Sequence, residues 1–121
     1  MKRTPATRKA AEELRSKLSS VLLYNIADPR LELVTVTDVE VSKDREVADV
    51  YVSADESRYD EVLAGLDAAG GRIRSLVGKS LGWRVTPELR FHIDRSVDTA
   101  MRIATVLGEE QKWQNSISDQ H

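Results

Sequence analysis

The stretch SRYDEVLAGLDAAGGRIRSLVGKSL, residues 57–81, carries the pattern that decides the fold. Its apolar residues keep the i, i+3, i+4, i+7 spacing of an amphipathic helix, and this spacing does not lapse at Gly70 and Gly71. Inside a helix each glycine costs about 1 kcal/mol relative to alanine, so two in succession indicate a useful break. We therefore expect two helices joined at Gly70-Gly71, with a new helix N-terminus beside Arg72 and Arg74.

A helix N-terminus beside two guanidinium groups suits a phosphate, because its first backbone N–H groups have no partner within the helix. Taken alone, the two arginines fit a solvated helix face slightly better than a binding site. Cations near a helix N-terminus oppose the macrodipole, so an incoming anion would relieve that conflict. The glycine pair therefore favours a phosphate-binding function over a purely structural one.

The residues before this stretch predict one helix and a β-hairpin. Thr4-Pro5 is typical of a helix start, and Asp28-Pro29 of a stop, so we expect a helix over residues 5–26. Residues 33–41 and 47–53 are rich in β-branched side chains and predict two strands that pair in antiparallel fashion. The inward valines change parity near Thr37-Asp38, which indicates a β-bulge.

The residues after this stretch predict a third strand and a final helix. Apolar side chains occupy odd-numbered positions from Trp83 to Ile93, with Pro87 suited to an edge strand or a bulge. Ser96 can cap a helix that ends at Gly108, with Ala100, Ile103, Ala104 and Leu107 facing inward. Three strands with helices on one face make a single α+β domain over residues 1–108, followed by a polar tail over residues 109–121.

The composition excludes several classes of protein. The 121 residues are 40% hydrophobic and 31% charged, which is normal for a globular domain. The absence of cysteine excludes disulfides, thiolate metal sites and cysteine nucleophiles. No apolar run approaches the roughly 18 residues of a membrane span, and the charged N-terminus lacks the apolar stretch of a secretion signal. We expect a cytoplasmic protein with no membrane association.

The net charge of −2 conceals a segregated distribution. Residues 1–30 hold seven basic and three acidic side chains, residues 31–69 three and eleven, and residues 70–104 seven and three. Two basic segments that flank an acidic one can form a basic face, although solvated helices of alternating sign would give the same counts. The acidic segment could also keep the wrong face away from nucleic acid.

Other motifs fit structural explanations better than chemical ones. Gly78-Lys79-Ser80 matches the last three residues of a phosphate-loop motif, but Ile73 occupies the position where that motif needs its first glycine. His92 has no second ligand at a metal spacing, and we expect it to be satisfied or solvated. The acidic pair Asp38 and Glu40 lacks any sign of a pocket that would separate two carboxylate pKa values. We expect no enzymatic activity, metal, cofactor or small-molecule substrate.

The order of elements, with a broken helix between strands, matches the type II K-homology fold, whose members clamp nucleic-acid backbone at a Gly-x-x-Gly loop. Here Ala69-Gly70-Gly71 stands in place of that loop. This substitution and several further stretches resemble the bacterial ribosome-binding factor A family. The matching stretches lie within about residues 5–107: Asp28-Pro29-Arg30, VTVTDVEVS (34–42), ADVYVS (48–53), Ile73-Arg74, Arg84, PELRF (87–91) and Asp94-Arg95-Ser96.

The resemblance implies a monomeric factor, without catalytic activity, that binds the small ribosomal subunit and its rRNA during late maturation and supports processing of the precursor rRNA. Carried onto this chain, it gives three sets of RNA-contact residues. The first set is Ala69, Gly70, Gly71, Arg72, Arg74 and Lys79. The second is the N-terminal helix with Lys2, Arg3, Arg8, Lys9 and Arg15. The third is Arg84 and Arg90.

Few aromatic residues are available to stack on bases, so we expect recognition of RNA shape and backbone. Two alternatives belong to other classes of protein. One is a protein–protein adaptor whose acidic hairpin meets a basic partner, and its binding would survive ribonuclease. The other is a nucleotide-binding enzyme built around Gly78-Lys79-Ser80, for which we expect no nucleotide binding.

Overall fold

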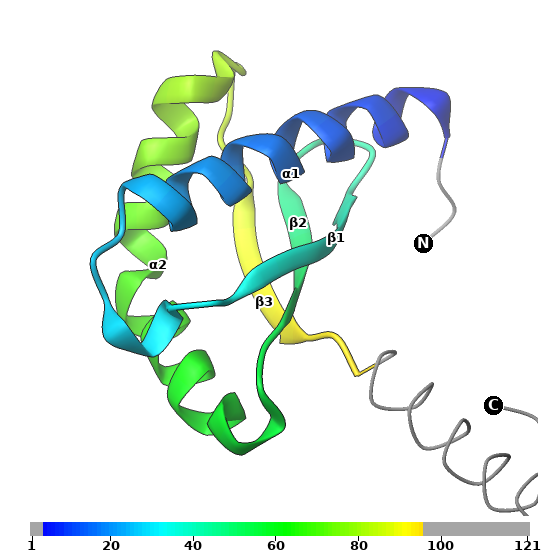
Figure 1. The fold of residues 1–121 in the computed structure, drawn as a ribbon. Coiled ribbons are helices and arrows are strands. Elements are labelled where there is room, and N and C mark those ends of the chain that lie inside the picture. The colour runs from blue at the N-terminus through cyan, green and yellow to red at the C-terminus, as the bar shows by residue number, and fades with distance from the viewer. Residues whose placement is uncertain (1–3, 96–121) are drawn as a thin grey trace, which may run out of the picture.

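The computed structural model describes residues 4–95, which form two layers (Figure 1). The two main helices are α1 (Pro5–Tyr24) and α2 (Tyr59–Leu81), and the strands are β1 (Thr35–Val41), β2 (Val47–Ser53) and β3 (Glu88–Ile93). Two single 3-10 turns, η1 (Pro29–Leu31) and η2 (Glu56–Arg58), precede β1 and α2. Among the described residues, neither long helix is apolar enough over a sufficient length to cross a bilayer.

Helix α1 starts where the sequence predicts. Thr4 caps it, and the Thr7 side chain completes a capping box by accepting a hydrogen bond from the Thr4 N–H at 2.8 Å. The helix ends at Tyr24, two residues before the predicted end. The Asp28-Pro29 stop is a 3-10 turn in which the Asp28 side chain accepts a hydrogen bond from the Arg30 N–H at 2.9 Å.

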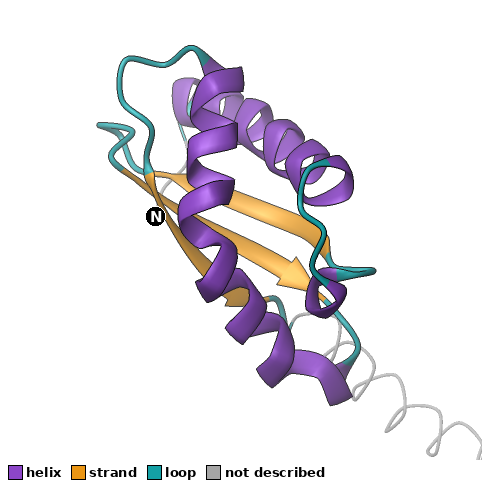
Figure 2. Ribbon diagram, turned by 90° about the vertical axis from the view of Figure 1, so that its left-hand side faces the viewer, coloured by secondary structure: helices purple, strands orange, loops and turns teal. Residues whose placement is uncertain are grey.

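The sheet has the order β1-β2-β3, and both helices cover one of its faces (Figure 2). Strands β1 and β2 form the predicted antiparallel hairpin, and the register shifts between Val36 and Asp38, which confirms the predicted bulge. Strand β3 pairs with β2 in parallel, because α2 carries the chain back across the helical face before β3 begins.

The hydrophobic core lies between the sheet and the two helices. Val50 and Val52 of β2 are fully buried, and they share this layer with Leu14 and Leu18 of α1. Ile73 of α2 is also fully buried, four residues after the half-buried Ala69, so the packing of α2 continues across the glycine pair. Close packing of this kind is worth about 1.5–3 kcal/mol for each large apolar side chain.

The predicted division into two helices at Gly70-Gly71 is wrong, because α2 is one continuous helix of 23 residues. Leu66 and Val77 are buried on either side of the glycine pair at the spacing of a single helix. Burial of these side chains outweighs the helix cost of two glycines, which is about 2 kcal/mol. No helix N-terminus therefore exists beside Arg72, and the predicted conflict with a macrodipole at that position disappears.

Two predicted boundaries also differ. Helix α2 begins at Tyr59, not at Ser57, and it has no side-chain cap, because Asp55 instead caps η2 through the Ser57 N–H. The alternation that starts at Trp83 belongs to a loop until Glu88, where β3 begins. Pro87 precedes that edge strand, as expected for a residue without an N–H. The predicted helix after Ser96 and the polar tail lie outside the described residues.

Candidate nucleic-acid interface

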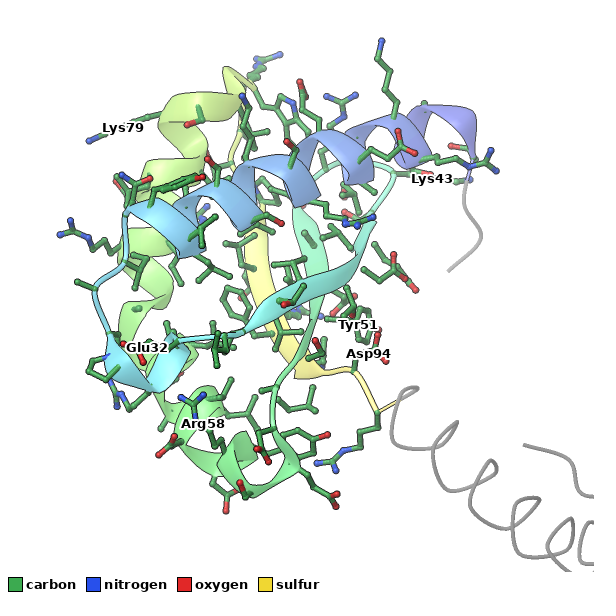
Figure 3. All side chains as sticks on the ribbon, viewed as in Figure 1. Glu32, Lys43, Tyr51, Arg58, Lys79 and Asp94 are labelled. Carbon is green, nitrogen blue, oxygen red and sulfur yellow. The ribbon has the colours of Figure 1, made fainter. Side chains whose placement is uncertain are left out.

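The acidic and basic residues of helix α2 lie in separate halves of the helix. Its first half holds Asp60, Glu61 and Asp67 and no basic residue, whereas its second half holds Arg72, Arg74 and Lys79 and no acidic residue. Acids near the N-terminus and bases near the C-terminus both favour the helix macrodipole. Lys79 and Arg58 lie near opposite ends of this helix (Figure 3). The positive half therefore offers a surface for an anion without a cost to the helix.

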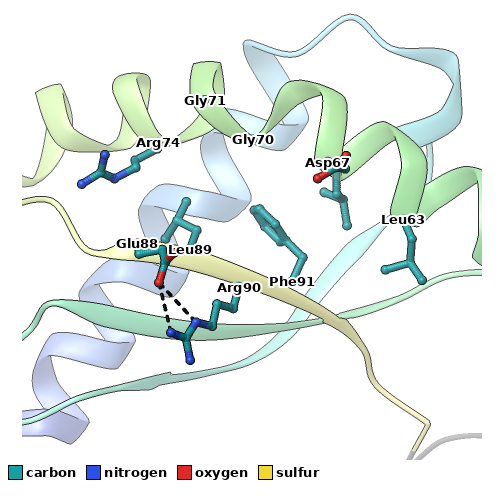
Figure 4. A pocket seen from close by; sticks show the side chains of 10 residues that line it. Leu63, Asp67, Gly70, Gly71, Arg74, Glu88, Leu89, Arg90 and Phe91 are labelled. Atoms are coloured by element: carbon teal, nitrogen blue, oxygen red, sulfur yellow. Dashed lines mark hydrogen bonds and ion pairs between the residues drawn. The ribbon is translucent and has the colours of Figure 1, made fainter.

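The glycine pair lies over a groove between α2 and the open edge of the sheet (Figure 4). This groove has a volume of about 490 Å³, and Phe91 and Leu89 of β3 form its floor. A Cβ atom added to Gly70 or Gly71 would meet no atom within 4 Å. The glycines are thus not needed for internal packing. They leave backbone exposed where another backbone could approach closely.

Arg74 is held against the loop between α2 and β3. Its Nε donates to the Pro87 carbonyl at 3.1 Å, and its Nη2 donates to the Thr86 carbonyl at 2.8 Å. Both acceptors are neutral, so the guanidinium keeps its full positive charge. The side chain therefore has a structural role, and it also presents a fixed cation at the rim of the groove.

Arg72 and Lys79 are exposed on the same half of α2. Within residues 4–95, neither side chain has a carboxylate within ion-pair distance. Lys79 also lines a second hollow of about 460 Å³, together with Gly71, Arg74, Ser75, Gly78 and Thr86. Gly71 and Arg74 border both hollows, so the two form a continuous surface across α2.

The other predicted residues are more scattered. Ala69 is half-buried and packs against the core, so its backbone belongs to the site but its side chain does not. The stem of Arg90 lines the groove, yet its guanidinium points away from α2 and pairs with Glu88 at 3.2 Å (Figure 4). Arg84 is exposed in the loop before β3. Gly70, Gly71 and Arg74 therefore border one groove, whereas the charged group of Arg90 points away from it.

Helix α1, which carries the second set of predicted cations, contacts the loop before β3. Trp83 Nε1 donates to Glu13 Oε1 at 2.7 Å, which joins the loop that carries Arg84 to the middle of α1. The Arg45 guanidinium covers the Trp83 ring at 4.7 Å, so the hairpin turn meets them too. Arg8, Lys9 and Arg15 are exposed on α1, whereas Lys2 and Arg3 lie outside the described residues.

The opposite face of the sheet has the opposite charge. Burial raises the pKa of the Tyr51 phenol, and the negative charges of Glu40, Asp49, Asp38 and Asp94 raise it further. His92 bonds to Asp49 Oδ1 at 2.8 Å and stacks on the Tyr51 ring, which confirms that it is satisfied. Among the described residues, no group of histidine and carboxylate side chains could hold a metal ion. An acidic surface of this kind would repel a polyanion.

Sequence reasoning missed three participants in the site. Phe91 and Leu63 line the groove, and Thr86 touches the position where a Cβ on Gly78 would lie, at 2.5 Å. The odd-numbered alternation of β3 could have placed Phe91 toward the helices. Nothing in the sequence signalled the Thr86 contact, because it depends on how the loop folds back along α2.

The fold and the divided charge define a small module of the K-homology-like class, with helices on one face and an open groove at the sheet edge. Residues 6–107 match the family model described as "Ribosome-binding factor A". A ribosome-binding factor A of Shewanella loihica is 42% identical over 106 residues, which cover 85% of this chain and 76% of the relative. The chain belongs to the ribosome-binding factor A family.

Two solved structures resemble the fold. The crystal structure of ribosome-binding factor A from Thermus thermophilus matches with a TM-score of 0.66 and 30% identity over 74% of this chain and 98% of that one. A homology model of the Thermus thermophilus factor, as fitted into the cryo-electron microscopy map of a complex of 30S with this factor, matches with a TM-score of 0.58 and 31% identity. That match covers 70% of this chain and 91% of the other.

Proposed function

We propose that this protein binds the small ribosomal subunit during late maturation, contacts its rRNA and supports processing of the precursor rRNA. It acts as a binding factor without catalysis, and it works as a monomer in the cytoplasm. Family membership and the Thermus thermophilus complex with 30S support this proposal. The observation that carries it to particular residues is the positive half of α2, where Arg72 and Lys79 are exposed beside the glycine pair.

The geometry favours contact with the RNA backbone over reading of base edges. Exposed guanidinium and ammonium groups neutralise phosphates and release counterions. Gly70 and Gly71 allow a sugar–phosphate backbone to approach the helix without a clash. Because α2 is continuous, its amides are already bonded within the helix, so side-chain cations hold the phosphates in place of a helix N-terminus.

The acidic face of the sheet fixes the orientation of this contact. A polyanion that approaches from that side meets the carboxylates around Tyr51, whereas the helical side presents cations. The protein therefore turns its helices toward the rRNA.

The test is co-sedimentation with purified small subunits over a range of salt concentrations. The double variant Arg72→Gln with Lys79→Gln leaves the core untouched. We expect the negative slope of log binding constant against log salt concentration to become shallower by roughly 1.5–2. Lys43→Gln, in the hairpin turn, is the matched control and should leave the slope unchanged. Binding of the double variant that equals the wild type would show that α2 is not the RNA-binding surface. Failure of the wild type to bind would overturn the function.

A further inference from the structure

A second apolar hollow lies away from α2's positive half. It has a volume of about 870 Å³ and is bounded by the end of α1, the segment after it and the start of β1. Leu22, Ile26, Leu31 and Val36 contribute to an apolar lining. Two leucines at this site are largely exposed, Leu23 at 71% and Leu33 at 91%. Exposed apolar side chains gathered around a hollow indicate a binding surface.

Leu33 is held in an unusual backbone conformation. Its φ angle is 63°, in the left-handed region that residues with a Cβ rarely adopt. Arg58 fixes the preceding segment, because its guanidinium donates to the carbonyls of Glu32, Pro29 and Arg30 at 2.8, 3.1 and 3.1 Å. The fold therefore keeps Leu33 in a strained backbone conformation with its side chain exposed to solvent. Strain of this kind is concentrated at functional sites.

The described chain ends at the end of the sheet where β1 begins. The Arg95 guanidinium lies 4.9 Å from the Tyr59 ring, and Tyr59 directly follows Arg58, which holds the segment lining the hollow. Thr35, at the start of β1, pairs with Ser53 at the same end of the sheet where Asp94 N–H donates to Val52. The chain thus leaves the sheet at the end where Thr35, which lines the hollow, begins β1, and the family match continues to residue 107.

We propose that residues 100–107 of this chain bind in the hollow between α1 and β1. Ala100, Ile103, Ala104 and Leu107 share one face at helical spacing, and this face suits the exposed Leu23 and Leu33. The tether between Arg95 and Ala100 is short, so the local concentration of the segment is roughly in the mM range. Docking covers both leucines and accounts for the strained backbone at Leu33. The inference is independent of RNA binding.

The chain has no cysteine, so a single spin label can be placed cleanly. A nitroxide at Arg102→Cys in the full-length protein should broaden the methyl NMR signals of Leu23 and Leu33, while Leu81 stays sharp. The matched control carries the label at Lys43→Cys, where Leu23 and Leu33 should stay sharp. Unbroadened Leu23 and Leu33 signals in the Arg102→Cys protein would overturn the proposal. Broadening seen only between labelled and unlabelled molecules would overturn it in favour of a second copy.

Leu33→Asn separates docking from folding. Asparagine tolerates a positive φ better than leucine, so this variant should fold at least as stably as the wild type. We expect it to abolish the broadening at Leu23, and Ile103→Ser to do the same. Broadening that survives both substitutions would show that the segment does not bind in this hollow. Because neither measurement uses ribosomes, their failure is distinct from failure of the proposed function.

Discussion

Arg74 of α2 ties the loop before β3 to the helix, with hydrogen bonds to the carbonyls of Thr86 and Pro87 at 2.8 and 3.1 Å. Arg74→Ala removes both donors, and we expect a loss of about 1–3 kcal/mol in the free energy of unfolding. Arg74→Lys should recover only part of that loss, because an ammonium lacks the planar fork that reaches both oxygens. Urea denaturation of the two variants measures these changes.

This double role means that Arg74 is a poor probe of RNA binding by itself. A binding defect in Arg74→Ala would mix lost charge with a displaced loop. Arg72→Ala serves as the control, because Arg72 is exposed and has no partner among residues 4–95. If Arg74→Ala unfolded at the same urea concentration as Arg72→Ala, the structural role assigned to Arg74 would be wrong.

Gly70→Ala and Gly71→Ala test whether the glycine pair serves function at the expense of stability. A Cβ at either position meets nothing, so each substitution should raise the free energy of unfolding by up to about 1 kcal/mol. The same methyl groups obstruct a backbone that approaches the helix, so affinity for small subunits should fall. Thermal unfolding and co-sedimentation measure the two effects on the same samples.

Gly78→Ala provides the contrast within the same helix. Its Cβ would lie 2.5 Å from Thr86 Oγ1, so the loop must shift, and we expect this variant to be less stable than the wild type. If Gly70→Ala and Gly71→Ala bound subunits as tightly as the wild type, the close approach of a backbone at the glycine pair would be excluded.

Some features of this fold follow from a few neighbouring residues, and others depend on residues far apart in the sequence. The bulge near Thr37 was predictable, because a change of parity among inward valines must be absorbed within one strand. The glycine pair misled, because the cost of glycine is local while the burial of Leu66 and Ile73 depends on the whole core. The structural role of Arg74 was not predictable from the sequence, because the carbonyls that it binds lie in a loop twelve and thirteen residues away.

Asp28 gives the fold a pH dependence at the end of α1. Hydrogen bonds from the Arg30 side chain and backbone lower the pKa of the Asp28 carboxyl. A carboxyl whose pKa is lowered on folding adds stability above its unfolded pKa of about 3.9 and loses it as the pH falls through the folded value. The wild type should therefore be more stable than Asp28→Asn at pH 7.

The difference should shrink as the pH falls below about 4, since the two side chains become alike once Asp28 is protonated. Chemical denaturation at several pH values follows it. Asp60→Asn, an exposed carboxylate on the first turn of α2, is the comparison variant for general effects of charge. A stability difference between Asp28→Asn and wild type that stayed constant across this range would contradict the Asp28–Arg30 interaction.

The Trp83–Glu13 hydrogen bond predicts that α1 and the loop between α2 and β3, which carries Arg84, move as one body. Trp83→Phe keeps most of the ring but removes the indole N–H that reaches Glu13 Oε1 at 2.7 Å, so we expect a loss of about 1 kcal/mol. Glu13→Gln weakens the same bond from the other side. In a double-mutant cycle the second substitution should therefore cost much less than it does alone. Additive losses would mean that the two side chains do not interact in solution, and Arg84 would then be free to move independently of the cations on α1.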